Sequence, residues 1–179
     1  MRNNYFLLLG LFLSGLTIRN IYELLKKAHR IRADNKIAFA VVFVAMGLLW
    51  VSWFSMCPLD PYRLSLPESL RWVGLAMVIV GLVLSISALV QLKGLENIKQ
   101  LVATGLYSKL RHPMYLGFIL WILGWSIYHG AALSLIPGLL GIGSILYWRK
   151  LEDRDLESRY GDGYRHYLER SWYCLFFIN

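Results

Sequence analysis

Two clusters of polar residues in the second half of the chain have the types and spacing needed to bind a charged ligand. The first is GLYSKLRHPMYLG, residues 105–117, in which Arg111 and His112 directly precede Pro113. Because proline is favoured in the first turn of a helix, this triplet predicts a helix that begins at Pro113, with His112 near its cap. A helix start is a ready anion site, and the Arg111 fork can bind a carboxylate or phosphate at two points.

Each residue of this first cluster also has a simpler interpretation. Arg111 and Tyr115, which is one turn into the helix on roughly the same side, could be ordinary anchors at a membrane interface. His112 could serve only as a helix cap. The combination of all three favours an anion site at the membrane surface.

The second cluster is RKLEDRDLESRYGDGYRHY, residues 149–167. Its charged residues recur every four positions in two series: Arg149, Asp153 and Glu157, and Asp155 and Arg159. Pairs at this spacing stabilise a helix by roughly 0.2–0.5 kcal/mol each, which accounts for most of the charges. It does not explain why acids gather where the fifth span ends, with Glu152 and Asp153 within one turn of the predicted membrane boundary. A carboxylate in that place can bind the two hydroxyls of a ribose, or a cation.

Two glycines separate the acidic part of this cluster from its tyrosines. Gly161 and Gly163 are predicted to break the helix, so that Tyr164 and Tyr167 follow in a separate segment. The first cluster suits an anion, and the second suits a diol or a cation. A zwitterionic nucleoside would need both, which predicts that the two clusters lie on the same side of a membrane.

The elements that position these clusters are predicted to be membrane helices. The chain has 179 residues, of which 57% are hydrophobic and 17% charged, with a mean hydropathy of +0.48; soluble domains have about 25% charged residues. A membrane-spanning helix needs roughly 20 mostly apolar residues. The apolar runs are too long and too continuous for the strands of a barrel, the other structure that can span lipid. The predicted spans are residues 5–24, 37–57, 70–92, 114–129 and 131–148, of which the fourth is short.

The first two spans carry no motif and are interpreted as plain lipid-facing or packing helices. In the third, Gly74 and Gly81 favour close packing against another helix. The fourth and fifth are joined at Gly130 and are predicted to form a tight hairpin. The spans together predict an all-α integral membrane protein with five transmembrane helices, a helical C-terminal tail and a single domain over residues 1–179.

Lys and Arg favour the cytoplasmic side of a membrane, and they alternate between the connections of this chain. Residues 25–36 contain five, residues 93–111 four and the part after residue 148 six, whereas residues 58–69 contain one. The predicted topology has the N-terminus outside, the C-terminus in the cytoplasm and both clusters on the cytoplasmic side. The net charge of +8 is attributed to this topology and to lipid headgroups, not to nucleic acid. The histidines and cysteines have no ligand spacing, so no metal is expected.

The two clusters, in this order and on either side of a membrane hairpin, resemble the isoprenylcysteine carboxyl methyltransferase family and the related phospholipid N-methyltransferases. The family pattern reads approximately G-x-Y-x-x-x-R-H-P-x-Y-x-G, followed by E-[ED]-x-x-L-x-x-x-[FY]-G-x-x-Y-x-x-Y. The matching residues are Gly105, Tyr107, Arg111, His112, Pro113, Tyr115 and Gly117, then Glu152, Asp153, Leu156, Tyr160, Gly161, Tyr164 and Tyr167. The resemblance covers roughly residues 101–168, less than half of the chain.

The resemblance implies a membrane enzyme that uses S-adenosylmethionine, bound on the cytoplasmic side between the fourth helix, the fifth helix and the tail. It implies catalytic roles for Arg111 and Glu152. The residues that it implies for cofactor binding are Tyr107, His112, Pro113, Tyr115, Glu152, Asp153, Tyr164 and Tyr167. The tail LERSWYCLFFIN, residues 168–179, departs from the family because it is apolar and aromatic where members often carry a short Pro- and Arg-containing stretch.

The expected reaction is methyl transfer to a lipophilic acceptor, first of all the carboxylate of an isoprenylcysteine-like substrate. A carboxylate is already ionised near neutral pH and needs no base, whereas an amine must first lose a proton. A phospholipid amine and a thiol remain as alternative acceptors. The expected partners are a lipophilic or prenylated substrate and membrane lipid, without an obligate protein partner. The expected location is a bacterial or archaeal inner membrane, or the endoplasmic reticulum of a eukaryote.

Two other classes of protein remain as alternatives. A non-catalytic carrier or assembly protein would place polar residues opposite one another at mid-membrane depth, where the spans offer only Ser and Thr and no ionisable pair. A reductase related to the membrane sterol reductases would bind a nicotinamide, but no G-x-G-x-x-G follows a strand in this chain.

Overall fold

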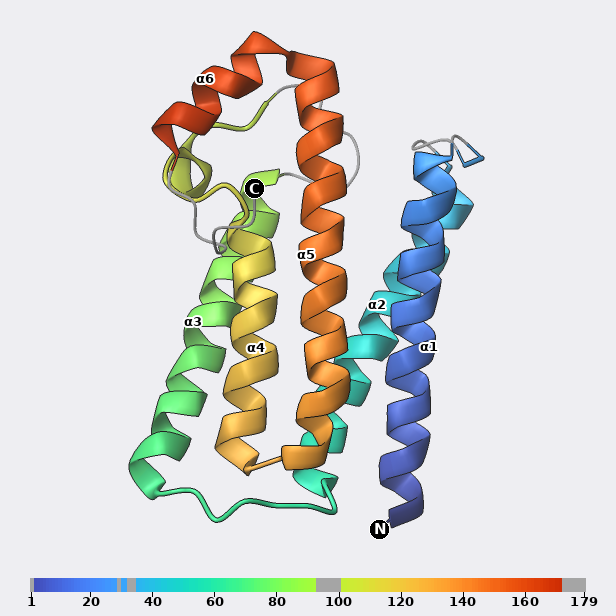
Figure 1. The fold of residues 1–179 in the computed structure, drawn as a ribbon, viewed down its shortest axis with the longest axis vertical. Coiled ribbons are helices and arrows are strands. Elements are labelled where there is room, and N and C mark those ends of the chain that lie inside the picture. Colours follow the sequence, from blue (N-terminus) through green and yellow to red (C-terminus); the bar gives the residue numbers. More distant parts are fainter. Residues whose placement is uncertain (1, 29, 32–34, 93–100, 172–179) are drawn as a thin grey trace.

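The protein is a bundle of long helices closed at one end by a short one (Figure 1). A computed structural model describes residues 2–28, 30–31, 35–92 and 101–171. Its α-helices are α1 (Arg2–Lys27), α2 (Lys36–Met56), α3 (Glu68–Leu92), α4 (Pro113–His129), α5 (Ala132–Tyr160) and α6 (Asp162–Arg170). A short 3-10 helix, η1 (Cys57–Leu59), begins the connection between α2 and α3. A second, η2 (Gly105–Ser108), precedes α4. The predicted all-helical class is confirmed for these residues.

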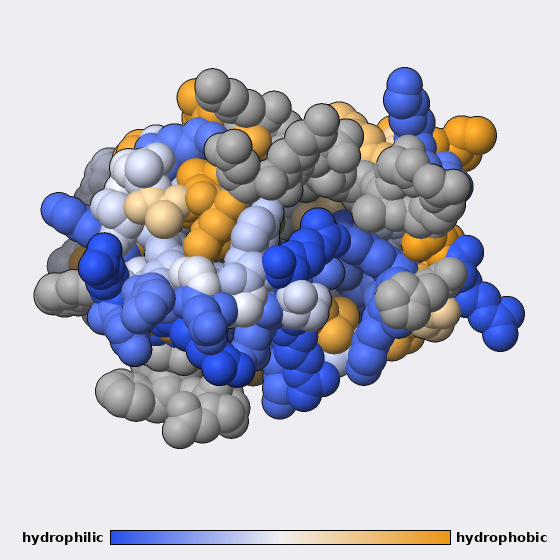
Figure 2. All heavy atoms as spheres, turned by 90° about the horizontal axis from the view of Figure 1, so that it is seen from above, coloured by the Kyte–Doolittle hydropathy of each residue, from blue (hydrophilic) through white to orange (hydrophobic). Residues whose placement is uncertain are grey.

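Helices α1 to α5 run alternately up and down, and α6 lies across the end at which α4 begins and α5 finishes (Figure 1). We call this the α6 end; the last residues of α1 and the first residues of α2 lie there too. The 58–67 loop and the turn at Gly130 lie at the opposite end, called the hairpin end. Hydrophilic side chains cover much of the described surface of the α6 end (Figure 2). The described parts of the basic connections therefore share one end of the bundle; residues 29, 32–34, 93–100 and 172–179 lie outside the described residues.

Four helical segments are long and apolar enough to cross a membrane: Asn3–Lys27, Lys36–Leu59, Glu68–Leu92 and Ala132–Tyr160. The fourth predicted span, α4, has 17 residues, which corresponds to about 26 Å at 1.5 Å per residue. Large apolar side chains are exposed on the outward faces of α2 and α3, among them Val41, Phe43, Val44, Val51, Val73, Val83 and Val90. Such faces are typical of helices in contact with lipid.

Helix α5 continues for three turns beyond its predicted apolar span. Arg149 and Asp153 are paired at 3.3 Å, and Asp155 and Arg159 at 2.8 Å, so the charges spaced four apart support the helix as expected. The break falls at Gly161, whose φ of +49° favours glycine. The prediction that Gly163 also breaks the helix is wrong, because this residue lies inside α6.

Helices α3 and α4 approach each other through glycines, which confirms the packing prediction for Gly74 and Gly81. A Cβ on Gly81 would lie 2.6 Å from the carbonyl oxygen of Gly117, and one on Gly74 would lie 2.6 Å from that of Gly124. Small residues at such crossings let two backbones come into contact in lipid. This crossing holds the start of α4, and with it the first polar cluster, at the α6 end.

Gly81→Ala is therefore expected to destabilise the protein by about 1–3 kcal/mol, because the new methyl group forces α3 away from α4. Gly47→Ala on α2 is the matched control, since no atom lies within 4 Å of a Cβ there. Thermal unfolding of the detergent-solubilised protein measures both. Equal melting temperatures for the two variants would contradict the glycine contact.

At the hairpin end, a buried carboxylate caps α5. Asp60 Oδ2 accepts hydrogen bonds from both the backbone N–H and the hydroxyl of Ser134, each at 2.6 Å. Gly130 makes the predicted tight turn between α4 and α5 with a φ of +62°. An acid at a helix N-terminus is stabilised by the free N–H groups and the dipole, so this cluster has a structural explanation.

Candidate active site

Helix α4 begins at Pro113, as the sequence predicts, and His112 occupies its cap position. The imidazole of His112 makes no capping hydrogen bond. Its Nε2 lies 2.7 Å from Asp153 Oδ1 on α5, across a sequence separation of 41 residues. The interpretation of His112 as a cap alone is therefore wrong: the side chain joins the start of α4 to the last turns of α5.

Asp153 is the point at which three helices meet. Besides its contact with His112, it accepts a hydrogen bond from the Tyr164 hydroxyl of α6 at 2.6 Å. Its second oxygen accepts from Arg149 Nε at 3.3 Å. Both carboxylate oxygens are thus engaged, and the side chain holds α4, α5 and α6 in a fixed arrangement.

Arg111 holds the other end of α6. Its Nε donates to the Ser171 hydroxyl at 3.0 Å, and its Nη2 donates to the backbone carbonyl of Leu168. Arg111 is buried, with 8% of its surface exposed. The guanidinium therefore points toward the end of α6, and the interpretation of Arg111 as a lipid-interface anchor is wrong.

Four tyrosines surround this network. The Tyr167 hydroxyl donates to the backbone carbonyl of Tyr107 at 2.8 Å, and the rings of Tyr164 and Tyr167 lie 5.9 Å apart. The ring of Tyr115 stacks on that of His112 at 5.6 Å. All four tyrosines are buried, so their rings form an aromatic wall at the α6 end.

The tyrosine hydroxyls outside the predicted spans remain protonated at neutral pH. Burial raises the pKa of Tyr164, and the hydrogen bond and charge of Asp153 raise it further. Burial raises the pKa of Tyr167 to about 12, although Arg111 opposes this. Burial and the nearby charge of Glu152 raise the pKa of Tyr107. These groups are therefore available as neutral hydrogen-bond donors.

Glu152 differs from Asp153 in having few partners. Its charge acts on Tyr107, Tyr164 and Tyr167, and its carboxylate lies next to the Tyr115 hydroxyl. Within the described ranges it forms no ion pair. A half-buried carboxylate without a countercharge is suited to bind a ligand.

Two charged residues of α1, which were not predicted to belong to the site, lie beside it. Arg19 and Glu23 form an ion pair at 2.6 Å, and the charges of both act on the Tyr115 hydroxyl. The interpretation of the first span as a plain lipid-facing or packing helix is wrong for this pair, which lies in the last turns of α1 and not at mid-membrane depth. Two ionisable residues four apart in an apolar run were the available signal.

The arrangement at the α6 end combines three kinds of group. It has an acid without a countercharge, an aromatic wall with neutral hydroxyls, and the start of helix α4 with its free N–H groups. A ligand with a cationic centre, a ring and an anionic group fits this combination. All eight residues predicted to bind a cofactor lie at this end, in η2, α4, α5 and α6 and at the N-cap of α4.

Comparison with known proteins places this region in a family. A model of the family described as phospholipid methyltransferase matches residues 70–163, just over half of the 179-residue chain. A relative from Schizosaccharomyces pombe, described as protein-S-isoprenylcysteine O-methyltransferase, is 32% identical over 76 residues. This similarity covers 39% of the chain and 30% of the length of that relative.

Proposed function

The chain belongs to the phospholipid methyltransferase family, and we propose that it transfers a methyl group from S-adenosylmethionine to the carboxylate of an isoprenylcysteine-like lipophilic acceptor. The observation that carries the proposal is Glu152, a carboxylate that forms no ion pair with any described residue and lies beside the aromatic wall, in a region that matches the family model. The similarity to the isoprenylcysteine O-methyltransferase supports the choice of a carboxylate acceptor.

The residues at the α6 end fit the donor. Glu152 binds its ribose hydroxyls or its amino group, and the start of α4 suits its carboxylate. Tyr107, Tyr115, Tyr164 and Tyr167 supply rings and hydroxyls around it. His112, Pro113 and Asp153 complete the set that the resemblance implies, with Asp153 holding His112 and Tyr164 in place.

Bound there, the donor would supply an electrophilic methyl group to the acceptor oxygen and would leave as a neutral thioether. The protein has to align the acceptor with this methyl group and exclude water, and alignment alone can lower a barrier by about 7–11 kcal/mol. A carboxylate acceptor requires no proton transfer, so no general base is needed. We assign Arg111 a positioning role, since it holds α6 against α4 and so closes the donor site.

The name of the family favours a second acceptor, the amine of a phospholipid. An amine must be deprotonated before it attacks, so this reaction requires a base near the donor. His112 and Asp153 are already bonded to each other, which leaves Glu152 and Glu23 as the acids nearest to Tyr115. A thiol acceptor is a third alternative.

We further propose that the whole chain is one membrane domain with five spans. Helix α4 is the short fourth span, packed against α3 and joined to α5 by the turn at Gly130. The alternation of basic segments places the N-terminus outside and the α6 end in the cytoplasm. The polar donor then enters from the cytoplasm of an inner membrane, or from the cytosolic face of the endoplasmic reticulum, while the lipophilic acceptor enters from the bilayer.

Mass spectrometry tests the reaction. The purified protein is incubated with methyl-labelled S-adenosylmethionine and, separately, with N-acetyl-S-farnesylcysteine, phosphatidylethanolamine and an alkyl thiol. The proposal predicts a labelled methyl ester of the farnesylcysteine, absent for His112→Ala. Label in the phospholipid alone would identify the amine alternative, and label in none of the three would contradict methyl transfer to these lipophilic acceptors.

A further inference from the structure

A second polar cluster lies on α1, beside the donor site. Arg19 Nη2 pairs with Glu23 Oε1 at 2.6 Å, and the Arg19 guanidinium lies 5.3 Å from the ring of Trp148 on α5. The indole N–H of Trp148 donates to Asn20 Oδ1 at 2.7 Å, and Asn20 donates to the Ser144 hydroxyl at 3.1 Å. These contacts fix the polar face of α1 against α5.

Charged groups in a membrane helix are energetically costly, so the Arg19–Glu23 pair is expected to have a function. Charged side chains within membrane helices are rare and usually mark a binding or transport site. Glu23 is 8% exposed and occupies one edge of the guanidinium. Arg19 Nε is buried and has no hydrogen-bond partner among the described residues. The Arg19 guanidinium therefore has an N–H donor that no described residue accepts.

The cluster adjoins the donor site through Tyr115. The hydroxyl of this α4 residue is acted on by the charges of Glu152, Arg19 and Glu23 together. Glu152 lies one turn after Trp148 on α5, so the two residues share a face of that helix. A group held by Arg19 is thus next to the part of the site assigned to the donor.

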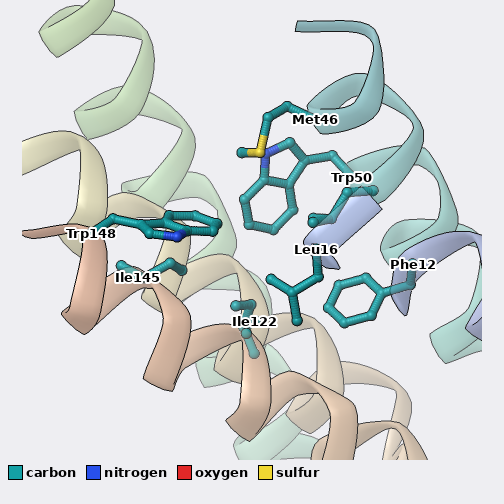
Figure 3. A pocket seen from close by; sticks show the side chains of 9 residues that line it. Phe12, Leu16, Met46, Trp50, Ile122, Ile145 and Trp148 are labelled. Carbon is teal, nitrogen blue, oxygen red and sulfur yellow. The ribbon is translucent and has the colours of Figure 1, made fainter. Parts of the chain in front are cut away.

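A small apolar cavity, with room for about one water molecule, lies beside the same cluster toward the middle of the bundle. It is lined by Phe12, Leu16, Met46, Leu49, Trp50, Ile122, Gly141, Ile145 and Trp148. Figure 3 shows the labelled side chains of α1, α2, α4 and α5 converging on it. Trp148 belongs both to this cavity and to the surroundings of Arg19, and Leu16 lies one turn from Arg19 on the same face of α1.

We propose that Arg19 binds the anionic head of the methyl acceptor, an amphiphile whose hydrocarbon chain extends into the lipid beside α1. The inference rests on the proposed function and assigns its acceptor subsite. An arginine whose plane is packed against a ring presents its N–H edge to a carboxylate or phosphate. Glu23 orients the guanidinium from the other side. When the acceptor is a carboxylate, methylation removes the charge that Arg19 holds, so the ester product binds more weakly than the acid.

The test compares charged and neutral probes by direct binding to the detergent-solubilised protein. One arm uses N-acetyl-S-farnesylcysteine and its methyl ester; the other uses lysophosphatidylethanolamine and the corresponding monoacylglycerol. In at least one pair, the parent protein is expected to bind the charged member at least about tenfold more tightly than the neutral member. The Arg19→Gln variant is expected to lose this preference. The arm that responds identifies the head as a carboxylate or a phosphate.

Arg30→Gln is the matched control, because Arg30 is exposed just beyond α1 at the same end of the bundle. It should keep the preference of the parent, and Arg19→Lys should restore part of it by returning the charge without the fork. A parent without preference in either arm, or an Arg19→Gln variant that keeps it, overturns the proposal. S-adenosylhomocysteine affinity, measured on the same samples, should be unchanged in Arg19→Gln and reports separately on the donor site.

Discussion

Glu152→Gln is expected to weaken S-adenosylhomocysteine binding roughly 10–100-fold, since the substitution removes a charge-assisted hydrogen bond. Glutamine has nearly the same size as glutamate, so the neighbouring Tyr115 and the aromatic wall should keep their positions. Methyl transfer should fall by at least the same factor at limiting donor concentration. Isothermal titration calorimetry with S-adenosylhomocysteine measures the affinity, and a melting curve shows that the variant is folded.

Glu157→Gln is the control for this experiment. Glu157 is on the same helix, five residues further, and its exposed side chain contacts Arg165 at 3.4 Å. An exposed pair of this kind contributes little to stability. If Glu152→Gln bound the donor product as tightly as Glu157→Gln, Glu152 would have no role in the donor site.

Asp153→Ala is expected to have the largest effect on the structure of the site. It removes the acceptor shared by His112, Tyr164 and Arg149, and it leaves the buried imidazole and hydroxyl without a partner. The expected destabilisation is about 2–4 kcal/mol, with separation of α6 from α4 and α5. The melting temperature and proteolysis at the exposed Gly161 linker report these two effects.

Asp155→Ala provides the comparison. Asp155 is two residues away on the same helix and pairs with Arg159 at 2.8 Å, but both side chains are nearly half exposed, at 44% and 49%. Loss of the Asp155 carboxylate should lower the free energy of unfolding by less than about 1 kcal/mol. A similar melting temperature for the two alanine variants would show that Asp153 does not hold the three helices together.

The helices could be predicted because the signals are local. Apolar runs of sufficient length place α1, α2, α3 and α5, and Pro113 marks the first residue of α4. The length of α5 was underestimated, because the apolar run ends at Trp148 while the paired charges extend the helix to Tyr160. Gly161 and Gly163 look alike in sequence, and only the backbone conformation shows that the first of them makes the break.

The contacts within the site depend on tertiary packing. The sequence identifies His112 and Asp153 as members of two clusters, but their bond across 41 residues requires α4 and α5 to lie side by side. The direction of Arg111 toward α6 could not be predicted either, because an arginine before a membrane helix is more often an anchor. Arg19 and Glu23 were missed since their significance depends on facing Tyr115 and Trp148, which are far away in the sequence.

These contacts give the α6 end a consistent role. Asp153 and Arg111 bind α6 to the helix ends from both sides, and Glu152 remains available between them. The α3–α4 glycine contact fixes the start of α4, and the capped hairpin fixes the start of α5. We therefore expect a rigid donor site between α4, α5 and α6, with an acceptor site beside it on α1.

Hydrogen–deuterium exchange of the full chain, with and without S-adenosylhomocysteine, tests the location of the donor site most directly. The account predicts that the ligand slows exchange in residues 105–117 and 149–170, with little change in the 58–67 loop at the hairpin end. Protection confined to the hairpin end, or none at a ligand concentration that saturates binding, would contradict a donor site between α4, α5 and α6.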